Sequence, residues 1–131
     1  MQKDIIEALI NAAVKARVRS YSPYSKFKVG AAVLVDSGKI YSGCNIENVS
    51  FGCSICAERV AIAKAVSEGY KNILAIAISG GETPIHPCGI CRQTMVEFGA
   101  PDMPIICTDK EGSTYKRYDL SRLMPSAFEK F

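Results

Sequence analysis

Apolar residues recur every three or four positions in three stretches of the chain, at 4–18, 56–68 and 88–98. This spacing predicts amphipathic helices, and Gly69 and Gly99 are natural stops for the second and third. Short runs rich in β-branched and apolar residues predict strands at 29–35, 39–44, 73–78, 104–107 and 114–118. A further short helix is expected at 120–123.

The order of these elements predicts an α/β fold. The turn formers at 36–38 join the first two strands into a hairpin, and the later strands alternate with helices. Such an order favours a mixed sheet with helices on its faces. No repeat, low-complexity stretch or linker interrupts the chain. We therefore expect residues 1–131 to form a single domain, a three-layer α/β/α sandwich around a mixed five-stranded sheet.

Composition narrows the possible functions. The 131 residues are 48% hydrophobic with a net charge of only +3, and the basic residues are scattered. This disfavours duplex nucleic acid as a partner, and also an enzyme that edits polynucleotides. No apolar run reaches the roughly 18–20 residues of a membrane span, and the N-terminal stretch does not resemble a secretory signal. The expected protein is cytoplasmic and has no membrane partner.

Six cysteines accompany a single histidine, and four of them form two C-x-x-C pairs, Cys53 with Cys56 and Cys88 with Cys91. One interpretation is a structural zinc held by all four thiolates. However, 31 residues separate the pairs, whereas structural zinc ribbons usually have about 15–20. A redox pair is another interpretation, although no thioredoxin-like flanking pattern is present.

A sharper interpretation uses three ligands, Cys56, Cys88 and Cys91, and leaves the fourth position of the metal open. Glu58 follows Cys56 by two residues, and a proline precedes Cys88. This is the three-cysteine form of the zinc nucleobase deaminase signature, in which the glutamate is the general acid and base. An open position binds water, and the metal lowers the pKa of that water toward neutrality. On its own, Glu58 would be interpreted as a first-turn residue that stabilises a helix dipole.

The surroundings of the cysteines suit thiolates. Each cluster begins a predicted helix, and helix N-termini favour negative charge. Three thiolates and Zn²⁺ sum to −1, which Arg59 and Arg92 could offset by hydrogen bonding to sulfur. The alternative is that both arginines are ordinary solvated charges.

The chain resembles cytidine deaminases of the small homotetrameric zinc type. The stretches that carry the resemblance are 21–32, 43–48, 56–59, 87–93 and 123–128. The resemblance implies a cytidine deaminase-like fold and one Zn²⁺ per chain bound by Cys56, Cys88 and Cys91, with Glu58 as the catalytic residue. It also implies substrate-binding roles for Phe27, Val29, Asn45, Glu47, Ala57 and Phe128.

These implied roles differ. Asn45 and Glu47 would hold the ribose hydroxyls, and their spacing at a strand end is consistent with one shared face. Phe27 and Val29 would wall the base, although their pattern equally fits core residues. Ala57 would offer its N–H to the pyrimidine carbonyl. Glu47 would otherwise be interpreted as an exposed loop acid.

The tail residue Phe128 either packs on its own domain or closes the site of a neighbouring subunit. Two departures from the family pattern stand out. Phe51 replaces a tyrosine that often reaches across subunits, and His86 replaces a small polar residue. His86 is the one histidine of the chain. It offers an alternative in which His86 and the three cysteines fill all four positions of the zinc ion, which would make the site closed and inert. Cys53 is interpreted as a non-ligand, and Cys44 and Cys107 as buried strand cysteines.

The leading hypothesis is therefore zinc-dependent hydrolytic deamination of cytidine and 2′-deoxycytidine in pyrimidine salvage, by a homotetramer. A second hypothesis is a related deaminase that acts on a free base, a modified nucleoside or a nucleoside antibiotic. Asn45 and Glu47 argue against free bases, which bring no ribose. A third is a non-catalytic zinc domain.

Overall fold

The computed structural model describes residues 1–130, and within them the expected elements form. The helices are α1 (Lys3–Arg17), α2 (Ala57–Ser67), α3 (Gly89–Phe98) and α4 (Leu120–Leu123), with a 3₁₀ turn, η1, at Phe51–Cys53. The strands are β1 (Gly30–Val35), β2 (Ile40–Cys44), β3 (Ile73–Ser79), β4 (Pro104–Thr108) and β5 (Tyr115–Asp119). Apart from η1, which lies in a stretch expected to be irregular, the bounds differ from expectation by a residue or two.

The five strands form one mixed sheet in the order β2-β1-β3-β4-β5. β3 and β4 run parallel, and the other neighbouring pairs are antiparallel. The parallel pair follows from α3, which carries the chain from one strand to the start of the next. The predicted mixed five-stranded α/β fold is confirmed.

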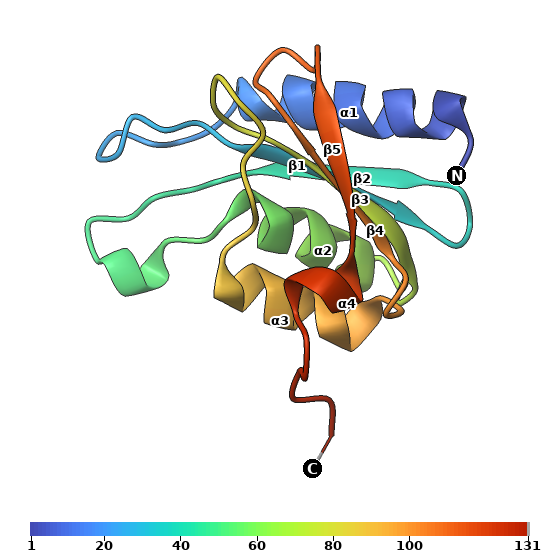
Figure 1. Ribbon diagram of the computed structural model, residues 1–131. Helices are drawn as coiled ribbons and strands as arrows, with labels where there is room; N and C mark the ends of the chain where they lie inside the picture. The colour runs from blue at the N-terminus through green and yellow to red at the C-terminus, as the bar shows by residue number, and fades with distance from the viewer. Residues whose placement is uncertain (131) are drawn as a thin grey trace.

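Helices cover both faces of this sheet, with α1 on one face and α2 and α3 on the other (Figure 1). Successive residues of β3 point to opposite faces. Ala75 and Ala77 pack in the cluster with α1, whereas Ile76 and Ile78 pack in the cluster with α2 and α3. Burial on both faces explains why this strand is a continuous apolar run.

Two glycines allow helices to lie directly on the sheet, near one end of its strands. A Cβ on Gly43 would lie 2.7 Å from the backbone nitrogen of Ala61, so α2 contacts β2 closely. A Cβ on Gly30 would lie 2.0 Å from the carbonyl oxygen of Ala13 in α1. The segments 18–29 and 45–56 leave the sheet at this same end (Figure 1).

The strand cysteines differ in burial. Cys107 in β4 is buried, as expected, but Cys44 is only half-buried, because it is the last residue of β2, an edge strand. In residues 1–130, no helix has both the length and the apolarity that a bilayer crossing requires.

Candidate metal centre and active site

Three cysteine sulfurs meet where two helices begin. Cys56 is the N-cap residue of α2, Cys88 is the N-cap residue of α3, and Cys91 lies in the first turn of α3. The Sγ of Cys88 lies 3.7 Å from that of Cys56 and 3.5 Å from that of Cys91. A tetrahedral zinc with bonds of about 2.3 Å separates its sulfur ligands by about 3.8 Å. The three side chains therefore fit a zinc ion.

The charges around the sulfurs favour thiolate. Neither helix start has a side-chain cap hydrogen bond, so its free N–H groups stabilise negative charge there. Hydrogen bonding from Cys91, with help from Cys88 and Arg59, lowers the pKa of the Cys56 thiol to about 5. The pKa of Cys91 is raised in turn, because its thiol holds the proton that it donates to Cys56.

Arg59 lies beside this negative charge. Burial is the largest single influence and would lower the pKa of its guanidinium, but hydrogen bonding and charge attraction to the Cys56 and Cys91 sulfurs together raise it. Among the described residues, the Arg59 Nε is the one buried side-chain nitrogen or oxygen without a hydrogen-bond partner. A buried donor of this kind next to sulfur suits a thiolate cluster.

Glu58 is buried next to the sulfur cluster, with 4% of its surface exposed. Burial raises the pKa of its carboxyl to about 7, and the charge of Cys56 adds to the rise. Its carboxyl also interacts with the Cys91 thiol, which acts in the opposite direction. A carboxyl in such a place can both take up and release a proton near neutral pH.

One pair of backbone hydrogen bonds joins the segment just before α2 to a second group of candidate residues. Ile46 and Ile55 exchange N–H···O bonds, both of 3.0 Å. Asn45 and Glu47 flank Ile46, and Cys56 follows Ile55. This bridge therefore holds the proposed ribose-binding pair beside the start of α2.

Asn45 fixes the segment that carries the proposed base wall. Its Oδ1 accepts the backbone N–H of Val29 at 2.9 Å and the Ser20 hydroxyl, and its Nδ2 donates to the carbonyl of Phe27 at 2.9 Å. Phe27 is 45% exposed and Val29 packs on the main core cluster. Phe27 is therefore not a core residue, whereas Val29 is partly buried against the core, and the role of both as a base wall stays a prediction.

Glu47 is held as a carboxylate by the loop that precedes β1. Its Oε1 accepts the backbone N–H groups of Tyr24 and Ser25, at 3.0 and 3.1 Å, and its Oε2 accepts the Ser25 hydroxyl. Hydrogen bonding from the Ser25 side chain lowers the pKa of Glu47. Sequence analysis missed Ser25, because a serine in a turn-forming stretch has no distinguishing signal.

The remaining predicted site residues lie in different surroundings. Ala57 is buried as the first residue of α2. Phe128 is 62% exposed, and its carbonyl accepts a hydrogen bond from Gln93 of α3. Arg92 donates to the carbonyls of Pro87 and Leu123, both at 2.8 Å, and so connects the loop before Cys88 to α4. Both bonds go to backbone carbonyls and not to sulfur, so the role of Arg92 in balancing the charge of the thiolates stays a prediction.

Neither rival metal ligand joins the three sulfurs. In residues 1–130, the group able to hold a metal contains Cys56, Cys88 and Cys91 alone. Cys53 is exposed in η1. The His86 ring lies tilted against that of Tyr118, with Nε2 3.1 Å from the tyrosine oxygen. The closed site with His86 therefore finds no support.

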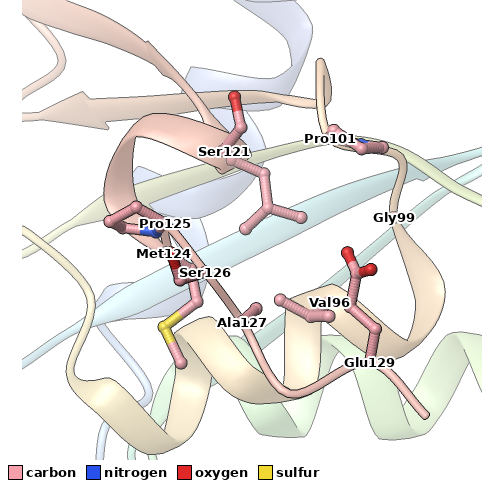
Figure 2. Close-up of a pocket in the computed structure, with 10 residues that line it drawn as sticks. Val96, Gly99, Pro101, Ser121, Met124, Pro125, Ser126, Ala127 and Glu129 are labelled. Atoms are coloured by element: carbon pink, nitrogen blue, oxygen red, sulfur yellow. The ribbon is translucent and has the colours of Figure 1, made fainter.

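The C-terminal tail is hydrogen-bonded to α3, because Gln93 of that helix donates to the carbonyl of Phe128. A hollow of about 390 Å³ separates part of the tail from α3 and α4, and both Val96 and Ala127 line it (Figure 2). None of the predicted site residues lines this hollow. We therefore assign it no part in the chemistry.

The chain is similar to known proteins over most of its length. Residues 3–107 match the family model described as the cytidine and deoxycytidylate deaminase zinc-binding region. The chain is 45% identical over 126 residues to a cytidine deaminase of Sporosarcina psychrophila, a match that covers 95% of this chain and 92% of that one. It is 42% identical to a cytidine deaminase of Halalkalibacterium halodurans, with 93% and 92% covered.

Solved structures give the same result. A crystal structure of cytidine deaminase from Burkholderia pseudomallei superposes with a TM-score of 0.89 at 43% identity and covers 98% of this chain and 100% of that one. The cytidine deaminase of Mycobacterium tuberculosis gives a TM-score of 0.83 at 37% identity, with 94% and 96% covered. The three-cysteine group, the glutamate beside it and these matches agree: the chain belongs to the family of zinc-binding cytidine and deoxycytidylate deaminases.

Proposed function

We propose that this protein hydrolyses cytidine and 2′-deoxycytidine to uridine and 2′-deoxyuridine, with release of ammonia. One observation carries the proposal. The buried Glu58 carboxyl lies beside a three-sulfur group that fits zinc, and the Ile46–Ile55 bridge holds Asn45 and Glu47, the residues that we propose to bind the ribose, beside the start of α2. The family membership of the chain supports the same reaction.

Cys56, Cys88 and Cys91 would hold the zinc ion and leave its fourth position open. When bound there, zinc supplies a water molecule whose pKa is lowered toward neutrality. Arg59, beside Cys56, offsets part of the negative charge of the three thiolates.

Glu58 moves the protons of the reaction. Its carboxylate takes a proton from the attacking water and delivers it to N3 of the pyrimidine ring, and it then assists the proton transfer to the departing amino group. Water adds at C4 and ammonia leaves, so no other reactant is needed. Burial of Glu58 keeps bulk water away from these transfers.

The second group of residues recognises a nucleoside. The fixed carboxylate of Glu47 accepts a hydrogen bond from a ribose hydroxyl, with Asn45 beside it. Phe27 and Val29 form the wall of the base, and the N–H of Ala57 faces the pyrimidine carbonyl. A free base would bring no ribose hydroxyl to Glu47 and Asn45, which is why we infer a nucleoside substrate.

We also infer a homotetramer that acts in pyrimidine salvage in the cytoplasm. Phe51, Val49 and Phe128 are 74%, 78% and 62% exposed, and an interface between subunits would cover such apolar side chains. The six cysteines are all free thiols, as expected in a reducing compartment. In the assembly, Phe128 closes the site of a neighbouring subunit.

A panel of substrates tests the proposed reaction. The purified zinc-loaded protein is incubated with cytidine, 2′-deoxycytidine, cytosine and cytidine 5′-monophosphate, and the loss of the cytosine chromophore is followed. We expect turnover of the two nucleosides and at least about tenfold lower kcat/KM for cytosine, which lacks the sugar that Glu47 binds. Turnover of cytosine alone would contradict the assignment of a nucleoside substrate.

A further inference from the structure

Arg17, the last residue of α1, connects two segments that are far apart in the sequence. Its Nε donates to the carbonyl of Lys28 at 3.2 Å and to the carbonyl of Gly80 at 2.9 Å. Lys28 directly follows Phe27, and Gly80 directly follows β3. One nitrogen therefore sets the spacing between the loop before β1 and the loop after β3.

The Phe27 ring lies against the second of these loops. A Cβ on Gly80 would lie 3.3 Å from Cζ of Phe27, and a Cβ on Gly81 would lie 3.4 Å from Cε1. The ring thus occupies the space beside the two glycines where a larger residue would place its Cβ, while nearly half of the residue stays exposed. Glycine backbone supports part of the ring and leaves the rest available for a flat ligand.

The other contacts of Phe27 do not fix this arrangement. Its N–H donates to the Ser25 hydroxyl at 3.0 Å, and its carbonyl accepts from Asn45 at 2.9 Å. Both bonds connect Phe27 to the residues around the proposed ribose site and not to the loop after β3. Within residues 1–130, the side-chain hydrogen bonds that link this loop to Gly80 run through Arg17.

The end of α1 is a firm support for this link. A Cβ on Gly30 would lie 2.5 Å from the backbone nitrogen of Arg17, so the helix end and the start of β1 are in direct contact. The backbone of Arg17 is therefore closely packed against the start of the strand that follows Phe27. The side chain then spans a fixed gap.

We propose that Arg17 is a positioning residue for the pyrimidine ring of the substrate. It does not touch the substrate but holds the Lys28 and Gly80 carbonyls together, and so fixes the orientation of the Phe27 wall. This role rests on the proposed function, in which Phe27 contacts the base. Because the wall contacts the base before and during the reaction, its misplacement raises KM more than it lowers kcat.

Two substitutions separate the donor from the shape of the side chain. Arg17→Gln keeps an N–H donor on the atom after Cδ, whereas Arg17→Met has a similar length and places a methyl group there. Loss of a charge-assisted hydrogen bond predicts a rise of about tenfold in the KM of Arg17→Met for cytidine, with kcat within about twofold. Arg17→Gln should keep KM within about threefold of the parent value. Both variants should retain the parent's zinc content and melting temperature within a few degrees.

A double-mutant cycle with Phe27→Leu tests whether Arg17 acts through the ring. In the Phe27→Leu background, Arg17→Met should raise KM by less than about twofold, because the wall that it positions is already gone. Equal effects in both backgrounds would overturn the proposal, as would a parental KM for Arg17→Met or a loss of zinc from it. A parent protein that does not deaminate cytidine would instead overturn the proposed function.

Discussion

At the scale of single residues, the two C-x-x-C pairs are not equivalent. Cys88 and Cys91 lie at the start of one regular helix, and both sulfurs turn to the same point. Cys53 lies in the 3₁₀ turn η1, and its side chain is exposed away from the sulfur group. The geometry thus separates three zinc ligands from a fourth cysteine with the same spacing.

Substitution of the two kinds of cysteine should give opposite results. Cys53→Ser is expected to keep one zinc per chain and parental deamination of cytidine, because Cys53 contributes no ligand. Cys88→Ser removes one of three ligands and should lose most of the zinc and nearly all activity. Metal analysis by mass spectrometry after dialysis distinguishes them. Loss of zinc from Cys53→Ser would favour a structural four-cysteine site.

The sequence could single out the three cysteines and Glu58, which the structure brings together, because their chemistry needs fixed spacing along helix starts. It could not show what holds Glu47 and Asn45. Glu47 is fixed by two backbone N–H groups and a serine hydroxyl from a loop more than twenty residues away. Such contacts depend on the path of the loop. The loop has no hydrophobic periodicity, so the sequence does not predict its path.

At the scale of elements, the position of α2 decides the geometry of the site, because α2 carries Cys56 and Glu58 at its start. The helix lies against β2 only because Gly43 has no side chain. Single bridges such as Ile46–Ile55 then align the preceding segment with the helix. The sequence predicted the regular elements within a residue or two, but a lone bridge within an irregular stretch gave no signal.

A methyl group at position 43 should therefore displace α2. We expect Gly43→Ala to lower the free energy of unfolding by about 1–3 kcal/mol, because its Cβ would overlap the backbone of Ala61. Zinc affinity should fall with it. Gly52→Ala is the matched control, since a Cβ there meets nothing within 4 Å, and it should change stability by less than about 0.5 kcal/mol.

Thermal unfolding of the zinc-loaded and the chelated protein measures both effects. The account of α2 would be wrong if Gly43→Ala and Gly52→Ala had the same melting temperature and zinc affinity as the parent. A fall in stability without a fall in zinc affinity would show that β2 adapts while α2 stays in place.

At the scale of the whole molecule, several large apolar side chains among the described residues lie exposed on the surface. Tyr24 and Phe51 meet edge to face at 6.1 Å near the proposed substrate loops, and both are exposed. The sequence showed an aromatic tail at Phe128 but not which surface it covers, since that depends on the arrangement of subunits. The proposed tetramer accounts for these exposed groups.

Mixed assemblies test whether a neighbour completes each site. Phe128→Ala and Glu58→Gln subunits are co-expressed with different tags, and the mixed oligomer is purified. If Phe128 closes a neighbouring site, a subunit with intact Glu58 regains Phe128 from its partner. The mixed oligomer should then exceed the average activity of the two pure variants by several-fold. Activity equal to that average, or an active monomer in sedimentation, would contradict the proposal.

The central claim is that Glu58 moves the protons of a zinc-dependent cytidine deamination. The most direct measurement is the kcat of Glu58→Gln for cytidine together with the zinc content per chain. We expect one zinc per chain, as in the parent, and a kcat lower by a factor of about 10² to 10⁴, the usual contribution of a general acid and base. A zinc-loaded Glu58→Gln protein that forms uridine at the parental rate would contradict the account.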